Sequence, residues 1–166
     1  LMASRNLVGG AAWVREQAEA GVDLSTAVEK GKSVFAGPEI MGKTLAVVGL
    51  GAIGVLVANA AYALGMEVYG YDPYLSVETA LRLDRHVHCV KDETELWQKA
   101  DYITLHLPYN ESTKDTINAQ VLAQTKPGVR IINLARGGLV NEAALVEALN
   151  TGRVARYVTD FPSAGI

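Results

Sequence analysis

The chain has 166 residues, of which 49% are hydrophobic and 20% are charged, and its formal net charge is −3. This slight acidic excess provides no basic surface for following a phosphate backbone, which argues against a nucleic-acid partner. Because Cys89 is the single cysteine, an intrachain disulfide is excluded and a reducing, cytoplasmic location is expected.

Residues 1–43 are predicted to form two helices and a connector ahead of the main domain. The first helix is expected over Leu1–Ala20. The second is expected to begin at a cap formed by Asp23 or Ser25 and to end near Gly31.

Strands and helices alternate over residues 44–166. Strands are predicted over Thr44–Val48, Glu67–Tyr71, Val87–Val90, Tyr102–Leu107, Arg130–Asn133 and Ala155–Thr159. Helices are predicted over Ala52–Leu64, Val77–Leu83, Glu93–Lys99, Ala119–Gln124 and Glu142–Leu149. Because parallel strands need crossover connections, this alternation predicts an α/β, doubly wound Rossmann fold. It would have a parallel sheet of six or more strands in the order 3-2-1-4-5-6, with helices on both faces.

The uncharged run Leu45–Met66 is long enough to cross a membrane, but its glycines divide it into a strand and a helix. A strand buried on both faces, followed by a helix facing the core, needs this apolar composition. No membrane partner is therefore expected.

Residues 49–54 have the sequence GLGAIG, which matches the pattern G-x-G-x-x-G between a strand and a helix. Gly49 would permit the tight turn, Gly51 would let a pyrophosphate approach the backbone, and Gly54 would let the helix pack against the strand. The helix start then offers free N–H groups and a positive dipole end to phosphates. No lysine follows the glycines, which excludes a P-loop. A glycine turn without a ligand is the alternative.

Asp72 follows the second predicted strand directly and lies 18 residues beyond Gly54, the last glycine of the turn. A carboxylate at this position accepts hydrogen bonds from the adenosine ribose hydroxyls and repels a 2′-phosphate, so NAD is favoured over NADP. A turn aspartate before Pro73 is the alternative, and it is compatible with the first role.

Three further polar residues lie at or just beyond the ends of predicted strands. Arg136 could grip a carboxylate through two hydrogen bonds and polarise a neighbouring carbonyl, or it could be a surface arginine beside a turn. Asp160 could hold the nicotinamide carboxamide, or it could cap a turn. His106, close to Pro108, is expected to line the nicotinamide side of the cleft, with packing alone as an equal alternative.

A metal site is not expected. His86 and His88 would share one face of the third strand with Cys89 on the other, and no further ligands lie nearby. The strand is expected at a partly exposed sheet edge, and Cys89 is expected to be a buried apolar residue.

Five segments together resemble the D-2-hydroxyacid dehydrogenases, and the resemblance covers nearly the whole chain. They are IMGKTLAVVGLGAIG (40–54), VYGYDP (68–73), ADYITLHLP (100–108), IINLARGGLV (131–140) and YVTDFP (157–162). Within that family, VEKGKSVFAGPEIMGK (28–43) and YVTDFP resemble the bacterial D-3-phosphoglycerate dehydrogenases.

The resemblance implies an oxidoreductase that transfers a hydride between NAD and a D-2-hydroxy acid, namely D-3-phosphoglycerate, in L-serine biosynthesis. It implies contacts from Ala52 and Ile53 to the pyrophosphate, from Asp72 to the ribose, from His106, Leu107 and Pro108 along the cofactor cleft, from Leu134 and Ala135 through their backbone, and from Asp160 to the nicotinamide. Arg136 would be the catalytic, substrate-orienting arginine. The first helix would take part in a homodimer.

Two features depart from the family. Its acid/base histidine lies downstream of the arginine, with a glutamate between them, whereas all three histidines here precede Arg136 and no glutamate follows Asp160. The family's substrate domain, whose two halves flank the cofactor domain, is absent from this chain. We therefore expect this polypeptide to bind NAD and to turn over little or no substrate alone.

Other functions on this fold remain possible from sequence. One is an NAD-sensing regulator similar to the C-terminal-binding corepressors, which resemble dehydrogenases down to the arginine. Another is an adenosylhomocysteinase-like hydrolase, against which the ARGG segment argues. A third is an assembly module that dimerises without affinity for nucleotides.

Overall fold

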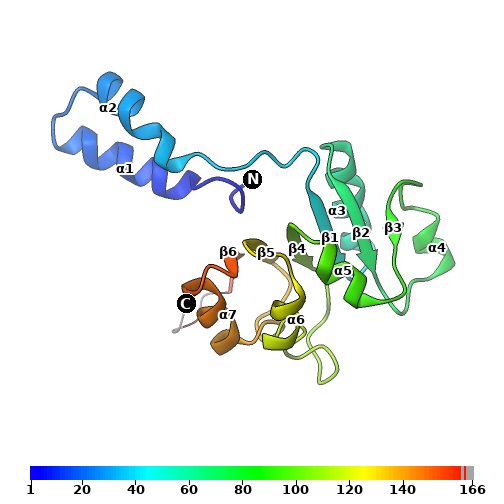
Figure 1. Ribbon diagram of the computed structural model, residues 1–166. Helices are drawn as coiled ribbons and strands as arrows, with labels where there is room; N and C mark the ends of the chain where they lie inside the picture. The colour runs from blue at the N-terminus through cyan, green and yellow to red at the C-terminus, as the bar shows by residue number, and fades with distance from the viewer. Residues whose placement is uncertain (162, 164–166) are drawn as a thin grey trace. The chain divides into compact units, whose positions relative to one another are not determined.

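The computed structural model describes residues 1–161 and Ser163 (Figure 1). Pro162, the last residue of the YVTDFP segment, lies outside the described residues. The chain divides into two compact units, Leu1–Glu39 and Ile40–Ile166.

The first unit begins with helix α1, Leu7–Glu19, so the prediction of a helix from Leu1 is wrong. The helix starts later because the Asn6 side chain accepts a hydrogen bond from the Gly9 N–H (3.2 Å) and so caps it. At its other end, Gly21 adopts a positive φ of 69°, which stops the helix.

Helix α2, Leu24–Gly31, is followed by a 3-10 turn, η1, Lys32–Phe35. Of the two predicted caps, Asp23 serves, because its carboxylate accepts from the Thr26 N–H (3.1 Å). Neither α1 nor α2 contains a fully buried residue. The helices of this unit therefore keep most of their apolar side chains at least partly exposed.

The second unit is built on a parallel six-stranded sheet in the order β3-β2-β1-β4-β5-β6, which confirms the predicted Rossmann topology (Figure 1). The strands are β1 (Thr44–Val48), β2 (Glu67–Tyr71), β3 (His88–Cys89), β4 (Tyr102–Leu105), β5 (Val129–Asn133) and β6 (Val154–Thr159). Every residue of β1 is buried, as expected for a central strand covered on both faces.

Helices connect the strands. They are α3 (Ala52–Ala63), α4 (Val77–Ala80), α5 (Glu93–Lys99), α6 (Ala119–Gln124) and α7 (Glu142–Asn150). Helix α3 packs against β1 and β2, whereas α5 contacts α6 and α6 contacts α7. The main core cluster joins Leu96 and Trp97 of α5 to Ala46 and Val48 of β1, and it contains no residue of α3. Alternate residues of β1 therefore face different helices.

Strands β4 and β3 and helix α4 are shorter in the structure than predicted. Strand β4 ends at Leu105 rather than Leu107, because its ladder with β1 ends at the pair of Val48 and Leu105, after which the His106 N–H donates a last bond to the Val48 carbonyl (2.8 Å). Strand β3 contains only His88 and Cys89, because only these two residues pair with β2. Helix α4 ends at Ala80, after which the chain continues in i→i+3 turns.

The expectation that Cys89 is buried is wrong, because the thiol lies exposed on the edge strand. Partial burial of Cys89 nevertheless raises the pKa of its thiol, and this lowers the thiolate fraction at neutral pH. Within residues 1–161 and Ser163, no helix combines the length and the apolar character that membrane crossing requires.

Candidate cofactor site

The sheet register places the expected site residues along one edge. Five adjacent strands, in the order β2, β1, β4, β5 and β6, end at residues that are aligned across the sheet. These residues are Tyr71, Val48, Leu105, Asn133 and Thr159. The residues that directly follow them are Asp72, Gly49, His106, Leu134 and Asp160. The structure therefore brings all five to the carboxyl edge, where doubly wound sheets bind ligands.

Two of the three glycines in the 49–54 turn are required by packing. Gly49 has a φ of 91°, and an added Cβ there would lie 2.6 Å from the His106 carbonyl oxygen. A Cβ on Gly54 would overlap the Gly49 carbonyl oxygen. The start of α3 is thus folded tightly against the ends of β1 and β4, as the two glycines allow.

Gly51 differs from both neighbours. Its φ of −72° suits any residue, and an added Cβ would meet nothing within 4 Å. It is the N-cap of α3 without any side-chain capping bond, and the next residues, Ala52 and Ile53, are exposed. The start of α3 is consequently open at Gly51, and because the first N–H groups of a helix lack intrahelical partners, this is the arrangement that a diphosphate needs.

The carboxylate of Asp72 is bonded to the glycine turn itself. Its Oδ2 accepts from the Leu50 N–H (2.9 Å), and its Oδ1 accepts from the Tyr74 N–H (2.8 Å). Asp72 thus has the turn role that the sequence suggested, and it also fixes the turn that carries Gly51. Because Asp72 is only half-buried, lone pairs of its carboxylate remain available to a ribose.

Sequence reasoning missed the support beneath this turn. Leu50 is almost fully buried, and a Cβ added to Gly70 in β2 would come within 2.8 Å of the Leu50 side chain. A glycine inside a strand marks a close approach of another group, so Gly70 itself was the available signal.

His106 lies partly buried beside the turn. Its Nε2 is 3.1 Å from the Thr104 hydroxyl oxygen, and burial lowers the pKa of His106 below its ordinary value of 6.5. The imidazole is therefore neutral at neutral pH. The Leu107 side chain also packs near the turn, 3.0 Å from where a Gly49 Cβ would be, and Pro108 is exposed.

Arg136 is exposed in the loop after β5, and its Nη1 donates to the Ala135 carbonyl (2.7 Å). The end of β6 lies beside this loop, because a Cβ on Gly137 would be 3.9 Å from the Phe161 Cβ. Asp160, which precedes Phe161, is exposed. The loop of Arg136 and the strand end of Asp160 thus form one part of the edge.

The two other histidines serve packing. His86 precedes β3, so its predicted place on that strand is wrong, and its ring stacks on Tyr62 at 4.9 Å. His88 stacks on Tyr69 at 4.7 Å. Among the described residues, no group of three or more His, Cys, Asp or Glu side chains is placed to hold a metal ion.

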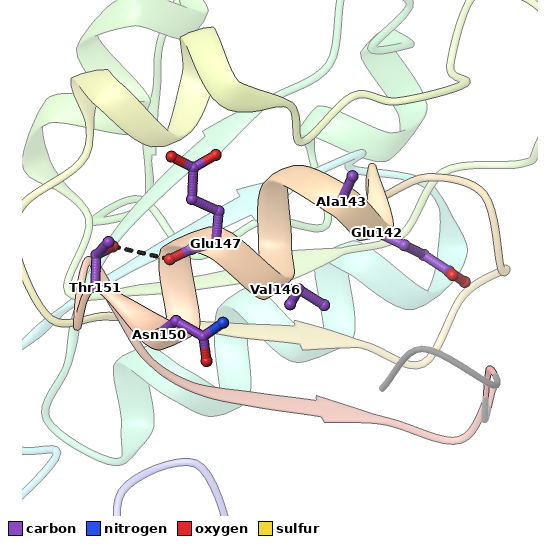
Figure 2. A pocket seen from close by; sticks show the side chains of 6 residues that line it. All are labelled: Glu142, Ala143, Val146, Glu147, Asn150 and Thr151. Carbon is purple, nitrogen blue, oxygen red and sulfur yellow. Dashed lines mark hydrogen bonds between the residues drawn. The ribbon is translucent and has the colours of Figure 1, made fainter.

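An open depression runs along the outer side of α7 (Figure 2). It is lined by Glu142, Ala143, Val146, Glu147, Asn150 and Thr151. The Thr151 hydroxyl donates to the Glu147 carbonyl (2.9 Å), which fixes the helix end rather than a ligand group. Two carboxylates would repel a diphosphate, so this depression is not a suitable cofactor site.

Residues 1–164 match the family model for the NAD binding domain of D-isomer specific 2-hydroxyacid dehydrogenases. The chain belongs to this family. As an NAD-binding domain of the D-2-hydroxyacid dehydrogenases it uses NAD as cofactor, and the open start of α3 with the adjacent carboxylate of Asp72 fits that ligand.

Several relatives of this domain are D-3-phosphoglycerate dehydrogenases. The chain is 43% identical to that of Bacillus subtilis, over 80% of the chain and 25% of the relative. It is 46% identical to that of Mycobacterium leprae, over 84% of the chain and 26% of the relative. The chain thus spans about a quarter of the length of these relatives.

Solved structures of the family share the fold. D-mandelate dehydrogenase of Rhodotorula graminis, in an apo form, matches with a TM-score of 0.74 and 30% identity over 93% of this chain and 47% of its own. The NAD-complexed D-isomer specific 2-hydroxyacid dehydrogenase of Lactobacillus delbrueckii ssp. bulgaricus matches with a TM-score of 0.69 and 32% identity, over 77% of this chain and 38% of its own.

Proposed function

We propose that this chain is the cofactor-binding domain of a D-3-phosphoglycerate dehydrogenase, which transfers a hydride between NAD and C2 of D-3-phosphoglycerate in L-serine biosynthesis. The 43% and 46% identities to enzymes of that name support this substrate over other D-2-hydroxy acids. The single observation that carries cofactor binding is the open backbone at Gly51, at the start of a helix and next to an acid-anchored turn.

The residues at the carboxyl edge of the sheet would hold different parts of NAD and the substrate. Bound NAD would supply the hydride acceptor at its nicotinamide ring. The pyrophosphate is held by Gly51, Ala52 and Ile53, the ribose by Asp72, and the nicotinamide half by His106, Leu107, Pro108, Leu134, Ala135 and Asp160. Arg136 holds the substrate carboxylate with two N–H groups and draws electron density from the neighbouring carbonyl.

The neutral state of His106 suits the nicotinamide side of the cleft. The oxidised nicotinamide ring is itself cationic, and a second full positive charge beside it would weaken binding. Because burial keeps the pKa of His106 low, the imidazole adds no such charge at neutral pH.

A polypeptide of these 166 residues should bind NAD without measurable turnover. It has no histidine beyond Arg136 to exchange the proton of the substrate hydroxyl. General acid/base catalysis contributes a factor of about 10²–10⁴ in rate. We propose that a histidine and a glutamate outside these residues supply that step, in a cytoplasmic enzyme.

We also propose a homodimer formed through the first unit. A groove at the start of α1 is lined by five apolar residues and one arginine, namely Met2, Leu7, Val8, Ala11, Ala12 and Arg15, and Val8 is 64% exposed. Apolar surface of this kind is typical of subunit contacts. Sedimentation velocity should show a dimer that Val8→Glu converts to monomer. Val34→Glu, at an exposed valine outside the groove, should leave the dimer intact. If the Val8→Glu variant is also still a dimer, the assignment of the dimer contact to this groove is wrong.

Calorimetric titration of the chain with NAD tests the cofactor site. We expect micromolar to sub-millimolar affinity, and Gly51→Ala should weaken it at least about tenfold because the added methyl would displace the pyrophosphate from the backbone. The fold should tolerate this change, since the Cβ enters open space at an ordinary φ. Gly10→Ala in α1, where the Cβ would make an ordinary 3.5 Å contact with Phe35, is the matched control. Full NAD affinity in Gly51→Ala would show that the turn does not bind the diphosphate.

A further inference from the structure

Asn133 is a buried polar side chain that is bonded to the loop of Arg136. It is the last residue of β5 and is only 1% exposed. Its Oδ1 accepts from the Ala135 N–H (3.2 Å), and its Nδ2 donates to the Arg136 carbonyl (2.9 Å) and to the Tyr157 hydroxyl (3.3 Å). Both amide hydrogens and the amide oxygen are therefore engaged.

We infer that Asn133 is a positioning residue that sets the direction of Arg136 toward the substrate. This inference rests on the proposed substrate-binding role of Arg136. Two bonds from one planar amide tie the backbone on both sides of Ala135 to the end of β5. The guanidinium is in turn bonded to the Ala135 carbonyl (2.7 Å), so its direction depends on the backbone that Asn133 holds.

The chemistry of the position requires an amide of this length. The Ala135 N–H needs an acceptor and the Arg136 carbonyl needs a donor, and the two lie on opposite sides of the same side chain. Aspartate offers acceptors only, and alanine offers neither group. Each replacement leaves at least one loop group without its buried partner, and the loop can then shift.

Tyr157 provides the outer support. It lies on β6, two residues before Thr159, the register partner of Asn133, and its ring packs against the main core cluster. Its hydroxyl oxygen accepts the second hydrogen bond that Asn133 Nδ2 donates. Tyr157→Phe removes this one bond and leaves both bonds to the loop, so it should have a small effect.

The test uses steady-state kinetics of the complete enzyme to which this chain contributes the cofactor-binding domain. Asn133→Ala should lower kcat/KM for the hydroxy acid about 10- to 100-fold, because a misplaced catalytic group costs up to about 10²-fold. NAD affinity should change less than about threefold, since Gly51 and Asp72 are untouched. Asn133→Asp should show a similar loss while it keeps the Ala135 N–H protected from hydrogen exchange, and it provides a second variant if the alanine variant folds poorly. Tyr157→Phe should lower kcat/KM less than about threefold.

Two comparisons separate positioning from general stability. In an Arg136→Ala background, Asn133→Ala should lower kcat/KM less than about threefold further, because its effect passes through Arg136. Thr125→Val also removes a buried bond from a side chain to the backbone, at the C-terminal end of α6, and should leave kcat/KM unchanged. The inference about Asn133 would be overturned, with the role of Arg136 left intact, by either of two results. One is a double variant whose loss in kcat/KM is the product of the two single losses, and the other is a loss in Thr125→Val as large as that in Asn133→Ala. An Arg136→Ala variant with normal kinetics would overturn the proposed role of Arg136 as well.

Discussion

Replacing Asp72 with asparagine separates its two roles. The carboxylate accepts from the Leu50 N–H through one oxygen and from the Tyr74 N–H through the other. Asparagine can keep only one of these bonds, because its NH₂ group would face a backbone donor. A hydrogen bond to a charged group contributes about 1.5–3 kcal/mol, so Asp72→Asn should loosen the glycine turn and weaken binding of both nucleotides.

The lost charge should also change the preference between nucleotides. Two unit charges about 4 Å apart repel by about 1 kcal/mol in water and by about 4 kcal/mol at an effective dielectric constant of 20. Since about 1.4 kcal/mol corresponds to a factor of ten, the carboxylate should disfavour NADP by roughly 5- to 700-fold. Asp72→Asn should remove most of this difference, and Asp72→Ala should remove it and both turn bonds together.

Calorimetric titration of each variant with NAD and with NADP measures both effects, and thermal unfolding reports the loosened turn. Asp23→Asn is the matched control, because it removes one carboxylate that accepts a backbone N–H (Thr26, 3.1 Å) from the other unit. It should leave the nucleotide preference unchanged. If Asp72→Asn still prefers NAD as strongly as the parent chain, or if Asp23→Asn narrows the preference equally, the assignment of Asp72 to the ribose is wrong.

Two further outcomes are expected in the same domain. Gly54→Ala should lower the free energy of unfolding by several kcal/mol and abolish NAD binding, measured by urea denaturation and calorimetry, because its Cβ would overlap the Gly49 carbonyl oxygen; near-parental stability would contradict the tight helix packing. Burial lowers the pKa of His106, so the unfolded chain takes up this proton more readily and stability should fall as pH drops from about 6.5 through the lower folded-state pKa. His106→Gln should reduce this loss of stability between about pH 7 and pH 5. If the variant unfolds with the same pH dependence as the parent chain, the lowered pKa of His106 is wrong.

The topology and the candidate edge follow from local sequence patterns. Buried strands alternate with helices, and the three glycines sit where a strand turns into a helix, so neither conclusion needs knowledge of distant contacts. The start of α1 was missed because a single side chain, Asn6, caps the helix later than the apolar pattern suggests. The exposure of Cys89 was missed although its strand was expected at the sheet edge, because the burial of a side chain on an edge strand depends on which tertiary contacts cover it.

The role of Asn133 was beyond sequence reasoning for a related cause. Its partners include its own loop, which local patterns could suggest, and Tyr157, which only the pairing of β5 with β6 brings near. Asp72 is similar, because its bond to Leu50 depends on the pairing of β1 with β2. In both cases a polar residue at a strand end supports a loop at the carboxyl edge through contacts across neighbouring strands.

The three glycines of the 49–54 turn do not carry equal information about function. Gly49 and Gly54 are needed by any chain that folds a helix start this tightly onto a strand, because a side chain at either position meets backbone. Gly51 has no such reason, since its φ is ordinary and a side chain would enter open space. A glycine at that position is explained by something that approaches the backbone from outside, and the free N–H groups of α3 favour an anion there. The case for a bound nucleotide therefore depends on the one glycine that the fold itself does not require.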